Sequence, residues 1–200
     1  MGGGGRLAGK LLYTGTMTAH FTGGAPVGGP AAPAKQHAPS TPKLVYPLFE
    51  PATAPFTTGG RQFGAPRTGR LHAGVDLLNP YKARIRAIAD GVVLQRPYYF
   101  YLGTDALEVH HPGIGVVRYG EISPLALVDL KAGDKVRMGD VIAHVGRQDS
   151  TGFCMLHLEM YTGKAAGALT APSSQPYERR SDLENPSTFV NELHKLTFGD

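Results

Sequence analysis

Short apolar segments alternate with turn signals along the chain beyond Leu44. Turn residues such as Asp90-Gly91 and His111-Pro112-Gly113 separate four apolar runs, namely Ile85 to Ala89, Val92 to Leu94, Ala106 to Val109 and Val116 to Tyr119. Short runs bounded by Gly, Pro and Asp are typical of β-strands that are joined by tight turns. The pattern therefore predicts an all-β domain.

Further strands and one helix are expected nearer the C-terminus. Gly133-Asp134-Lys135-Val136 and Gly139-Asp140-Val141-Ile142 repeat a turn that leads into a strand. Between Met155 and Met160, the apolar Leu156, Leu158 and Met160 alternate with Met155, His157 and Glu159. One face of this strand is therefore apolar, and the other is free to carry functional side chains. Ser187, as an N-cap, begins a predicted helix that runs to about Lys195.

The first part of the chain has a different composition. Gly2 to Gly5 is a run of four glycines, and Gly29 to Ala34 reads Gly-Pro-Ala-Ala-Pro-Ala, which resists both helix and sheet formation. We expect a flexible N-terminal arm over residues 1–43 and a single domain over residues 44–200. The whole chain has 200 residues, of which 42% are hydrophobic, and this is enough for one domain with a core.

Charge and cysteine usage exclude several classes of function. The formal net charge of +4 favours an anionic partner, but Arg179-Arg180 is the densest basic pair, and no basic run is interleaved with aromatics, so we expect no nucleic-acid partner. The single cysteine, Cys154, cannot form an intramolecular disulfide. No apolar stretch approaches 18 residues, so neither a membrane span nor a standard secretory signal is visible.

Three residues are candidate metal ligands. His72 and Asp76 are four residues apart, which on a straight strand would separate their Cα atoms by roughly 13 Å. Gly74 offers a bend that lets both side chains converge on one ion, and His157 supplies a third candidate ligand. Two histidines and one carboxylate leave the fourth position of a tetrahedral zinc ion open for water, as a catalytic site requires.

These residues belong to a longer series of motifs. In order, the chain carries Arg70-Leu-His-Ala-Gly-Val-Asp76, Ala89-Asp-Gly-Val-Val93, Tyr119-Gly120, Gly133-Asp-x-Val-x-x-Gly-Asp-Val-Ile142, Ser150-Thr-Gly152 and His157-Leu-Glu159. Over about residues 60–162 this order resembles the lysostaphin-type (LytM-like) zinc metallopeptidases, which act on peptidoglycan. The resemblance implies a small antiparallel β-sheet domain of the duplicated hybrid motif kind, with a groove along one face. It also implies zinc bound by His72, Asp76 and His157.

The resemblance further implies hydrolysis of peptide cross-links or stem peptides of bacterial peptidoglycan, but both helper histidines of the family are replaced. The first histidine of the family's His-x-His strand is Met155, and the one that follows Tyr-Gly is Glu121. We expect Glu121 to act as the general base, and the zinc to stabilise the oxyanion with help from either Tyr119 or Arg118, since adjacent strand residues cannot both face the site. Met155 is expected to shape the pocket, and Glu159 to orient a neighbouring ligand.

Two other functions compete with that of a zinc endopeptidase. One is a catalytically lapsed, zinc-containing module that binds peptidoglycan or a protein partner. The other is a carrier domain of the biotinyl or lipoyl kind, which would need a modifiable lysine in a hairpin such as Met-Lys-Met, and the chain has none. For the enzyme we expect action in the periplasm, in the cell wall or outside the cell, reached through a specialised secretion or phage-associated route.

Overall fold

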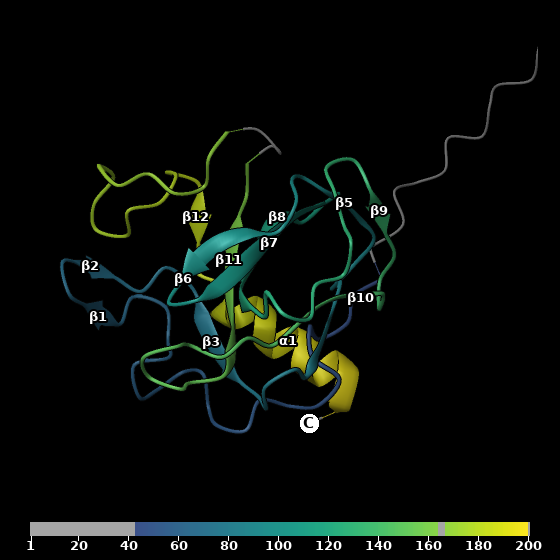
Figure 1. Ribbon diagram of the computed structural model, residues 1–200, viewed down its shortest axis with the longest axis horizontal. Helices are drawn as coiled ribbons and strands as arrows, with labels where there is room; N and C mark the ends of the chain where they lie inside the picture. Colours follow the sequence, from purple (N-terminus) through teal and green to yellow (C-terminus); the bar gives the residue numbers. More distant parts are fainter. Residues whose placement is uncertain (1–42, 164–166, 200) are drawn as a thin grey trace, which may run out of the picture. The chain divides into compact units, whose positions relative to one another are not determined.

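The computed structural model of the chain describes residues 43–163 and 167–199 (Figure 1). The predicted flexible arm falls on residues 1–43, of which only Lys43 is among the described residues. In chain order the elements are β1 (Pro66–Arg67), β2 (Arg70–Leu71), β3 (Val75–Leu78), β4 (Arg84–Arg86), β5 (Gly91–Val93), β6 (Tyr98–Tyr101), β7 (Thr104–His111), β8 (Gly115–Ile122), β9 (Lys135–Val136), β10 (Val141–His144), β11 (Met155–Tyr161), β12 (Leu183–Glu184) and α1 (Ser187–Phe198).

One antiparallel sheet organises the domain. Its three long strands lie side by side in the order β11, β8, β7, and the shorter strands extend this centre on both sides (Figure 1). One edge of β11 pairs first with β3 and then with β12, while β7 pairs with β6 near its start and with β5 near its end. β1 pairs only with β2, and β4 pairs with β10. The predicted all-β architecture is confirmed.

The central sheet has an apolar face and a polar face, and both are buried. On one face lie core side chains such as Leu107, Val117, Tyr119, Leu156 and Leu158, all of them fully buried. The alternate positions face the other way, and there the strands carry Asp76, Glu108, Arg118, His157 and Glu159. Strand alternation therefore gathers the charged groups of the domain on one side of the sheet.

The C-terminal helix differs from its prediction at both ends. It begins at Ser187 with Pro186 in the N-cap position, so Ser187 is not the cap, and the backbone N–H of Ser187 instead donates to the side chain of Asn185. It ends at Phe198, three residues beyond the predicted Lys195. Within the described ranges α1 is the only helix, and no helix there is long and apolar enough to cross a membrane.

Tyr46 ties the start of the domain to this helix. Its side chain is fully buried, its ring makes edge contacts with His194 and Phe198, and its backbone N–H donates to the Thr197 hydroxyl. The Tyr46 hydroxyl makes no well-formed hydrogen bond among the described residues, and its contact with the backbone of Ala52 is weak. Burial accordingly raises the pKa of Tyr46 to about 12. The ring stabilises the domain, whereas the buried hydroxyl costs free energy.

Replacing Tyr46 separates these two contributions. Tyr46→Phe removes only the hydroxyl, whose contact with Ala52 is weak, so we expect the free energy of unfolding to stay equal or to rise by about 1 kcal/mol. Tyr46→Ala removes the ring as well and should destabilise the domain by about 3–5 kcal/mol. Thermal melts followed by circular dichroism measure both changes. A clear loss of stability in Tyr46→Phe would mean that the hydroxyl has a partner.

Candidate metal centre and groove

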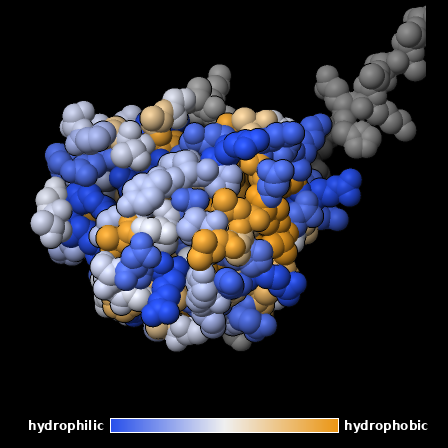
Figure 2. All heavy atoms as spheres, in the orientation of Figure 1, coloured by the Kyte–Doolittle hydropathy of each residue, from blue (hydrophilic) through white to orange (hydrophobic). Residues whose placement is uncertain are grey.

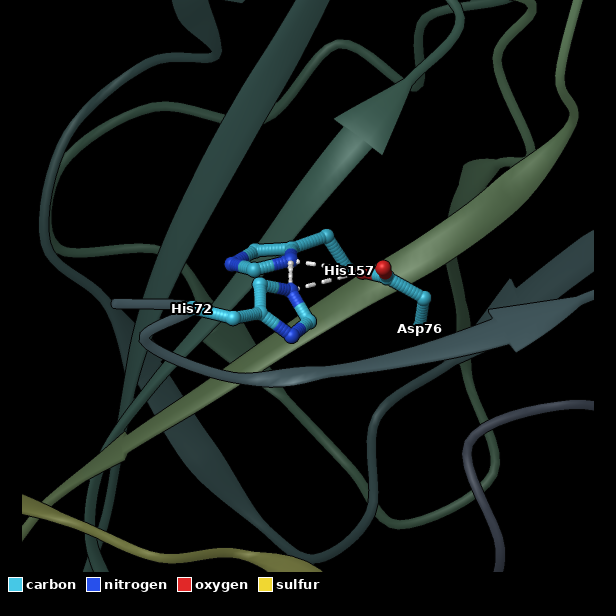
Figure 3. Close-up of side chains that lie close together, drawn as sticks. All are labelled: His72, Asp76 and His157. Atoms are coloured by element: carbon cyan, nitrogen blue, oxygen red, sulfur yellow. Dashed lines mark hydrogen bonds and ion pairs between the residues drawn. The ribbon is translucent and has the colours of Figure 1, made fainter. Parts of the chain in front are cut away.

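His72, Asp76 and His157 meet at one point. His72 lies in the loop between β2 and β3, Asp76 lies on β3, and His157 is the residue of β11 paired directly with Asp76. His72 Nε2 is 3.1 Å from Asp76 Oδ1 and 3.0 Å from His157 Nδ1, and the same Asp76 oxygen is 2.8 Å from His157 Nδ1 (Figure 3). All three side chains are buried. We call these three atoms the ligand triangle.

Gly74 makes this convergence possible because it has no side chain. A Cβ at position 74 would lie 2.4 Å from the backbone oxygen of Leu158 and 3.0 Å from two atoms of the His157 ring. The loop between His72 and Asp76 therefore passes directly against β11, closer than any larger residue permits. The bend predicted at Gly74 is present, and the close approach adds a second reason for glycine there.

In each histidine, the ring nitrogen that points away from the triangle, here called the outer nitrogen, already has a hydrogen-bond partner. His72 Nδ1 is 2.8 Å from the backbone oxygen of Gln62, so it donates there and leaves the Nε2 lone pair facing the triangle. His157 Nε2 is 3.0 Å from Glu159 Oε1 and donates to that carboxylate. The triangle is thus formed by two inward-facing imidazole nitrogens and a carboxylate oxygen. Such a set needs a positive charge at its centre, supplied either by a proton on His157 Nδ1 or by a metal ion.

The electrostatics agree with a site for one positive charge. Burial lowers the pKa of His72. Burial also opposes a charge on His157, but the hydrogen bonds to Asp76 and Glu159 outweigh it and raise the pKa of His157 above its ordinary value. For Asp76, burial is likewise outweighed by the bonds from His157 and His72, which hold its pKa well below the usual range. A metal ion would therefore displace the His157 proton.

The donor set and its spacing fit a zinc-like ion. Two imidazole nitrogens and one carboxylate oxygen are the usual ligands of a catalytic zinc. Three ligands of a tetrahedral ion, each about 2.0–2.1 Å from the metal, lie roughly 3.3 Å apart. The edges of the triangle measure 2.8, 3.0 and 3.1 Å, so the side chains need to open by only a few tenths of an ångström. In the described part of the chain this is the only such cluster.

Glu159 holds His157 in place. Its carboxylate is fully buried and accepts hydrogen bonds from Arg118 Nη1 and Arg179 Nε, both at 2.9 Å, and from the Tyr161 hydroxyl. Burial would raise the pKa of Glu159, but His157 and the arginines outweigh it and keep the group ionised. The predicted orienting role of Glu159 therefore has a geometric basis.

A β-bulge turns Glu121 toward the same site. Asp105 of β7 pairs with Ile122 of β8, but the next residue, Ala106, pairs with Gly120, so Glu121 is the extra residue on β8. Its φ of 57° lies in the left-handed region. Regular alternation would send the Glu121 side chain into the core beside Tyr119, whereas the bulge places it in the cavity that the ligand triangle lines.

The surroundings of Glu121 in this cavity shift its pKa toward neutrality. Burial raises its pKa to about 7, while the nearby His157 and the side-chain amide of Gln148 favour the charged form. Gln148 Nε2 donates to Glu121 Oε2 at 2.9 Å, and the Thr151 hydroxyl donates to Gln148 Oε1. A carboxyl group with a pKa near neutrality can both accept and return a proton.

The ligand triangle and Glu121 share a cavity of about 710 Å³, which we call the groove. The loop before β1, the β1–β2 hairpin, strand β6 and the loop before β11 form its walls. Its lining residues are Gly59, Gly60, Arg61, Arg67, Arg70, His72, Asp76, Leu78, Tyr98, Tyr99, Phe100, Tyr101, Glu121, Gln148, Thr151, Phe153, Met155, His157, Thr170 and Arg179. Met155 is buried in this wall, as expected for a residue that shapes the pocket.

Tyr119 is not part of the groove, so the expectation that it stabilises an oxyanion is wrong. It is fully buried on the apolar face of the sheet, where its hydroxyl accepts from the backbone N–H of Ile88 and lies 3.0 Å from His111 Nε2. Alternation along β8 explains this placement, because Arg118 and Gly120 occupy the opposite face.

Sequence reasoning missed residues that support the site. Gln148, which contacts Glu121, and Arg179, which holds Glu159, carried no recognised motif. Arg118, the alternative to Tyr119 for the oxyanion, shares the side of β8 that faces His157, but it donates to Glu159 there. No periodic signal existed for Arg179, because it reaches Glu159 from a long loop.

Comparisons with known proteins agree with this geometry. A sequence profile of Peptidase family M23 matches residues 70–168. The catalytic domain of the antimicrobial peptidase lysostaphin from Staphylococcus simulans has a TM-score of 0.50 and 21% identity, over 66% of this chain and 90% of that chain. A structure of lysostaphin covering more of that protein gives 0.55 and 18%, over 78% of this chain and 58% of the other. At such identities the likeness establishes the fold. No curated protein matches the sequence.

Removing one ligand should remove the metal. We expect His157→Ala, supplied with zinc and then dialysed, to fall from about one ion per chain to a small fraction of that. His110→Ala is the matched control, because His110 lies on β7 and does not line the groove. Elemental analysis against protein concentration measures the ratio. Stoichiometric zinc in His157→Ala would show that the ligand set is different.

Proposed function

The chain belongs to peptidase family M23, a family of metallopeptidases, and on this premise we propose that it is a zinc-dependent endopeptidase that hydrolyses peptide cross-links or stem peptides of bacterial peptidoglycan. The proposed zinc ligands are His72, Asp76 and His157. Peptidoglycan is the proposed partner, and the proposed place of action is the periplasm, the cell wall or the cell exterior.

The observation that supports catalysis most directly is the position of Glu121. A bulge turns this carboxyl group out of the core and into the groove that the ligand triangle lines, and burial there raises its pKa to about 7. A surface glutamate would have neither the strained backbone nor the raised pKa. Bulges beside active sites commonly re-aim one side chain in this way.

Each residue then has a stated role in the reaction. When bound, zinc supplies a Lewis acid that polarises the substrate carbonyl and activates water. Glu121 accepts the proton of the attacking water on its carboxylate and returns it to the leaving amine. Gln148 fixes Glu121 through the hydrogen bond to Oε2, and Glu159 fixes the His157 ring through Nε2.

A second candidate is a lapsed module that keeps zinc and binds peptidoglycan or a protein partner without cutting it. The observation in its favour is Met155, whose thioether stands in the groove where the resemblance implies an imidazole and can neither donate nor accept a catalytic proton. Digestion of purified peptidoglycan, with mass analysis of the fragments, separates the two candidates. Release of peptide fragments supports the enzyme, and intact peptidoglycan supports the lapsed module.

Glu121→Gln tests the general base. Glutamine keeps the shape of the side chain but cannot accept the proton, so we expect hydrolysis to fall at least about a hundredfold while the zinc content is unchanged. Glu50→Gln, at an exposed position outside the groove, is the control and should behave as the unmodified protein. Unaltered turnover in Glu121→Gln would remove Glu121 from the mechanism.

The pH dependence of hydrolysis follows from the same group. Glu121 is competent as a base only when ionised, so kcat/KM should rise with pH as its proton is lost. Its pKa is raised to about 7 by burial, and a bound cation lowers it, which places the midpoint at or below pH 7.

Gln148→Leu removes a hydrogen bond that favours the ionised form. We expect the rise in kcat/KM to move to higher pH in this variant, while the plateau at high pH is reduced much less. A pH–rate profile of the two proteins measures the displacement. An unchanged midpoint would indicate that another group controls the rise.

A further inference from the structure

Two arginines face each other across a hairpin at the edge of the groove. β1 and β2 form a two-stranded ribbon in which Arg67 is paired directly with Arg70, on either side of Thr68 and Gly69. Like charges at directly opposed positions of an antiparallel pair are destabilising. We call this ribbon the arginine hairpin. Pairing of the two strands does not explain why both positions carry arginine. An anion bound by both guanidinium groups would explain it.

Among the described residues, the shared carboxylate of Asp76 is the only one that pairs with either arginine. Arg67 Nη2 donates to the Gly60 oxygen at 2.7 Å and lies 3.4 Å from Asp76 Oδ2, and that carboxylate also serves the ligand triangle through Oδ1. Arg70 Nη1 donates only to the backbone oxygen of Leu71, at 3.3 Å. Among the described residues, no carboxylate lies within ion-pair distance of Arg70.

Arg61 repeats this arrangement. It lines the groove beside the hairpin, its Nε donates to the backbone oxygen of Pro55, and no described carboxylate pairs with it. Arg179 provides a contrast, because it lines the same groove but is buried and paired with Glu159. Three half-buried arginines therefore line the groove beside the buried, neutralised Arg179. Arg61 and Arg70 have no carboxylate partner among the described residues, and Arg67 shares that of Asp76 with the ligand triangle.

The position of this group relates it to the reaction site. Arg67 contacts the carboxylate of Asp76, so the hairpin begins one side chain away from the ligand triangle. In Figure 2 hydrophilic residues cover the side of the molecule where the hairpin lies, and apolar residues gather away from it. A substrate bound over the triangle must pass this cationic wall.

We propose that the arginine hairpin is a carboxylate-binding subsite, which makes the groove specific for peptides that carry a free carboxylate near the bond to be cut. Arg67 and Arg70 each present a planar fork of N–H donors suited to a carboxylate. This inference rests on the proposed peptidase function and specifies its substrate class. A stem peptide with an ionised carboxylate is accepted, and a neutral chain such as oligoglycine is not.

Binding, rather than turnover, gives the cleanest test. Two peptides of one sequence, one with a free carboxylate and one amidated at that carboxyl, are titrated calorimetrically into the metal-free full-length chain. We expect the carboxylate peptide to bind about 10- to 100-fold more tightly. Arg70→Gln should abolish this difference in affinity, mainly by weakening the binding of the carboxylate peptide. Arg137→Gln, at an exposed position outside the groove, should preserve it.

The same titrations are repeated on zinc-loaded Glu121→Gln protein, which keeps the assay valid where metal removal unfolds the chain, as circular dichroism would show. Equal binding of the two peptides, or an unchanged preference in Arg70→Gln, would overturn the subsite. Where the metal-free chain stays folded, a preference seen only with zinc would also overturn it, because the metal would then be binding the carboxylate. A preference that depends on Arg70 supports the subsite even where no hydrolysis is detected.

Two further peptides distinguish the source of the carboxylate. One has a C-terminal carboxylate and no acidic side chain, and the other has an internal glutamate and an amidated C-terminus. Stronger, Arg70-dependent binding of the first assigns the subsite to chain ends, and of the second to internal acidic residues. Failure of both, with oligoglycine bound equally well, would reject the proposal while leaving the peptidase function untouched.

Discussion

The arrangement of the site depends on one buried carboxylate, that of Glu159. It is fully enclosed, yet it remains ionised because Arg118, Arg179, Tyr161 and His157 all donate to it. Arg118 in turn bonds Glu108, so charges from β7, β8, β11 and a long loop neutralise one another on the polar face of the sheet. Loss of one member of such a set leaves the others buried without a partner, which is far more costly than never having buried them.

This network also explains why His157 is a well-defined ligand. A histidine on a strand could rotate about its side-chain torsions and present either nitrogen. The fixed acceptor at Nε2 selects Nδ1 for the triangle, much as the Gln62 backbone oxygen selects Nε2 of His72. Each histidine is therefore held in its orientation by a hydrogen bond from its outer nitrogen.

The sequence predicted the fold class and the main strands, because alternation and glycine-marked turns are local signals. The convergence of His157 with His72 and Asp76 followed from the family resemblance, because no local signal joins residues so far apart in the chain. Sequence reasoning failed where the structure departs from a local rule. Tyr119 was expected in the site because it lies two residues before Glu121. The bulge between them, however, makes the two side chains face opposite sides of the sheet. Arg179 and Gln148 reach the site from loops, and contacts across loops leave no periodic trace in one sequence.

The bulge on β8 has an evolutionary consequence. Because Glu121 is the one residue of β8 in excess over β7, losing its codon would leave the neighbouring pairs, Asp105 with Ile122 and Ala106 with Gly120, free to join in an unbroken ladder. The residues of the ligand triangle lie on β3, on β11 and in the loop before β3, so such a deletion would leave them in place. A lineage could in this way exchange a hydrolase for a binding protein in a single genetic step, while the scaffold that displays the metal remained intact.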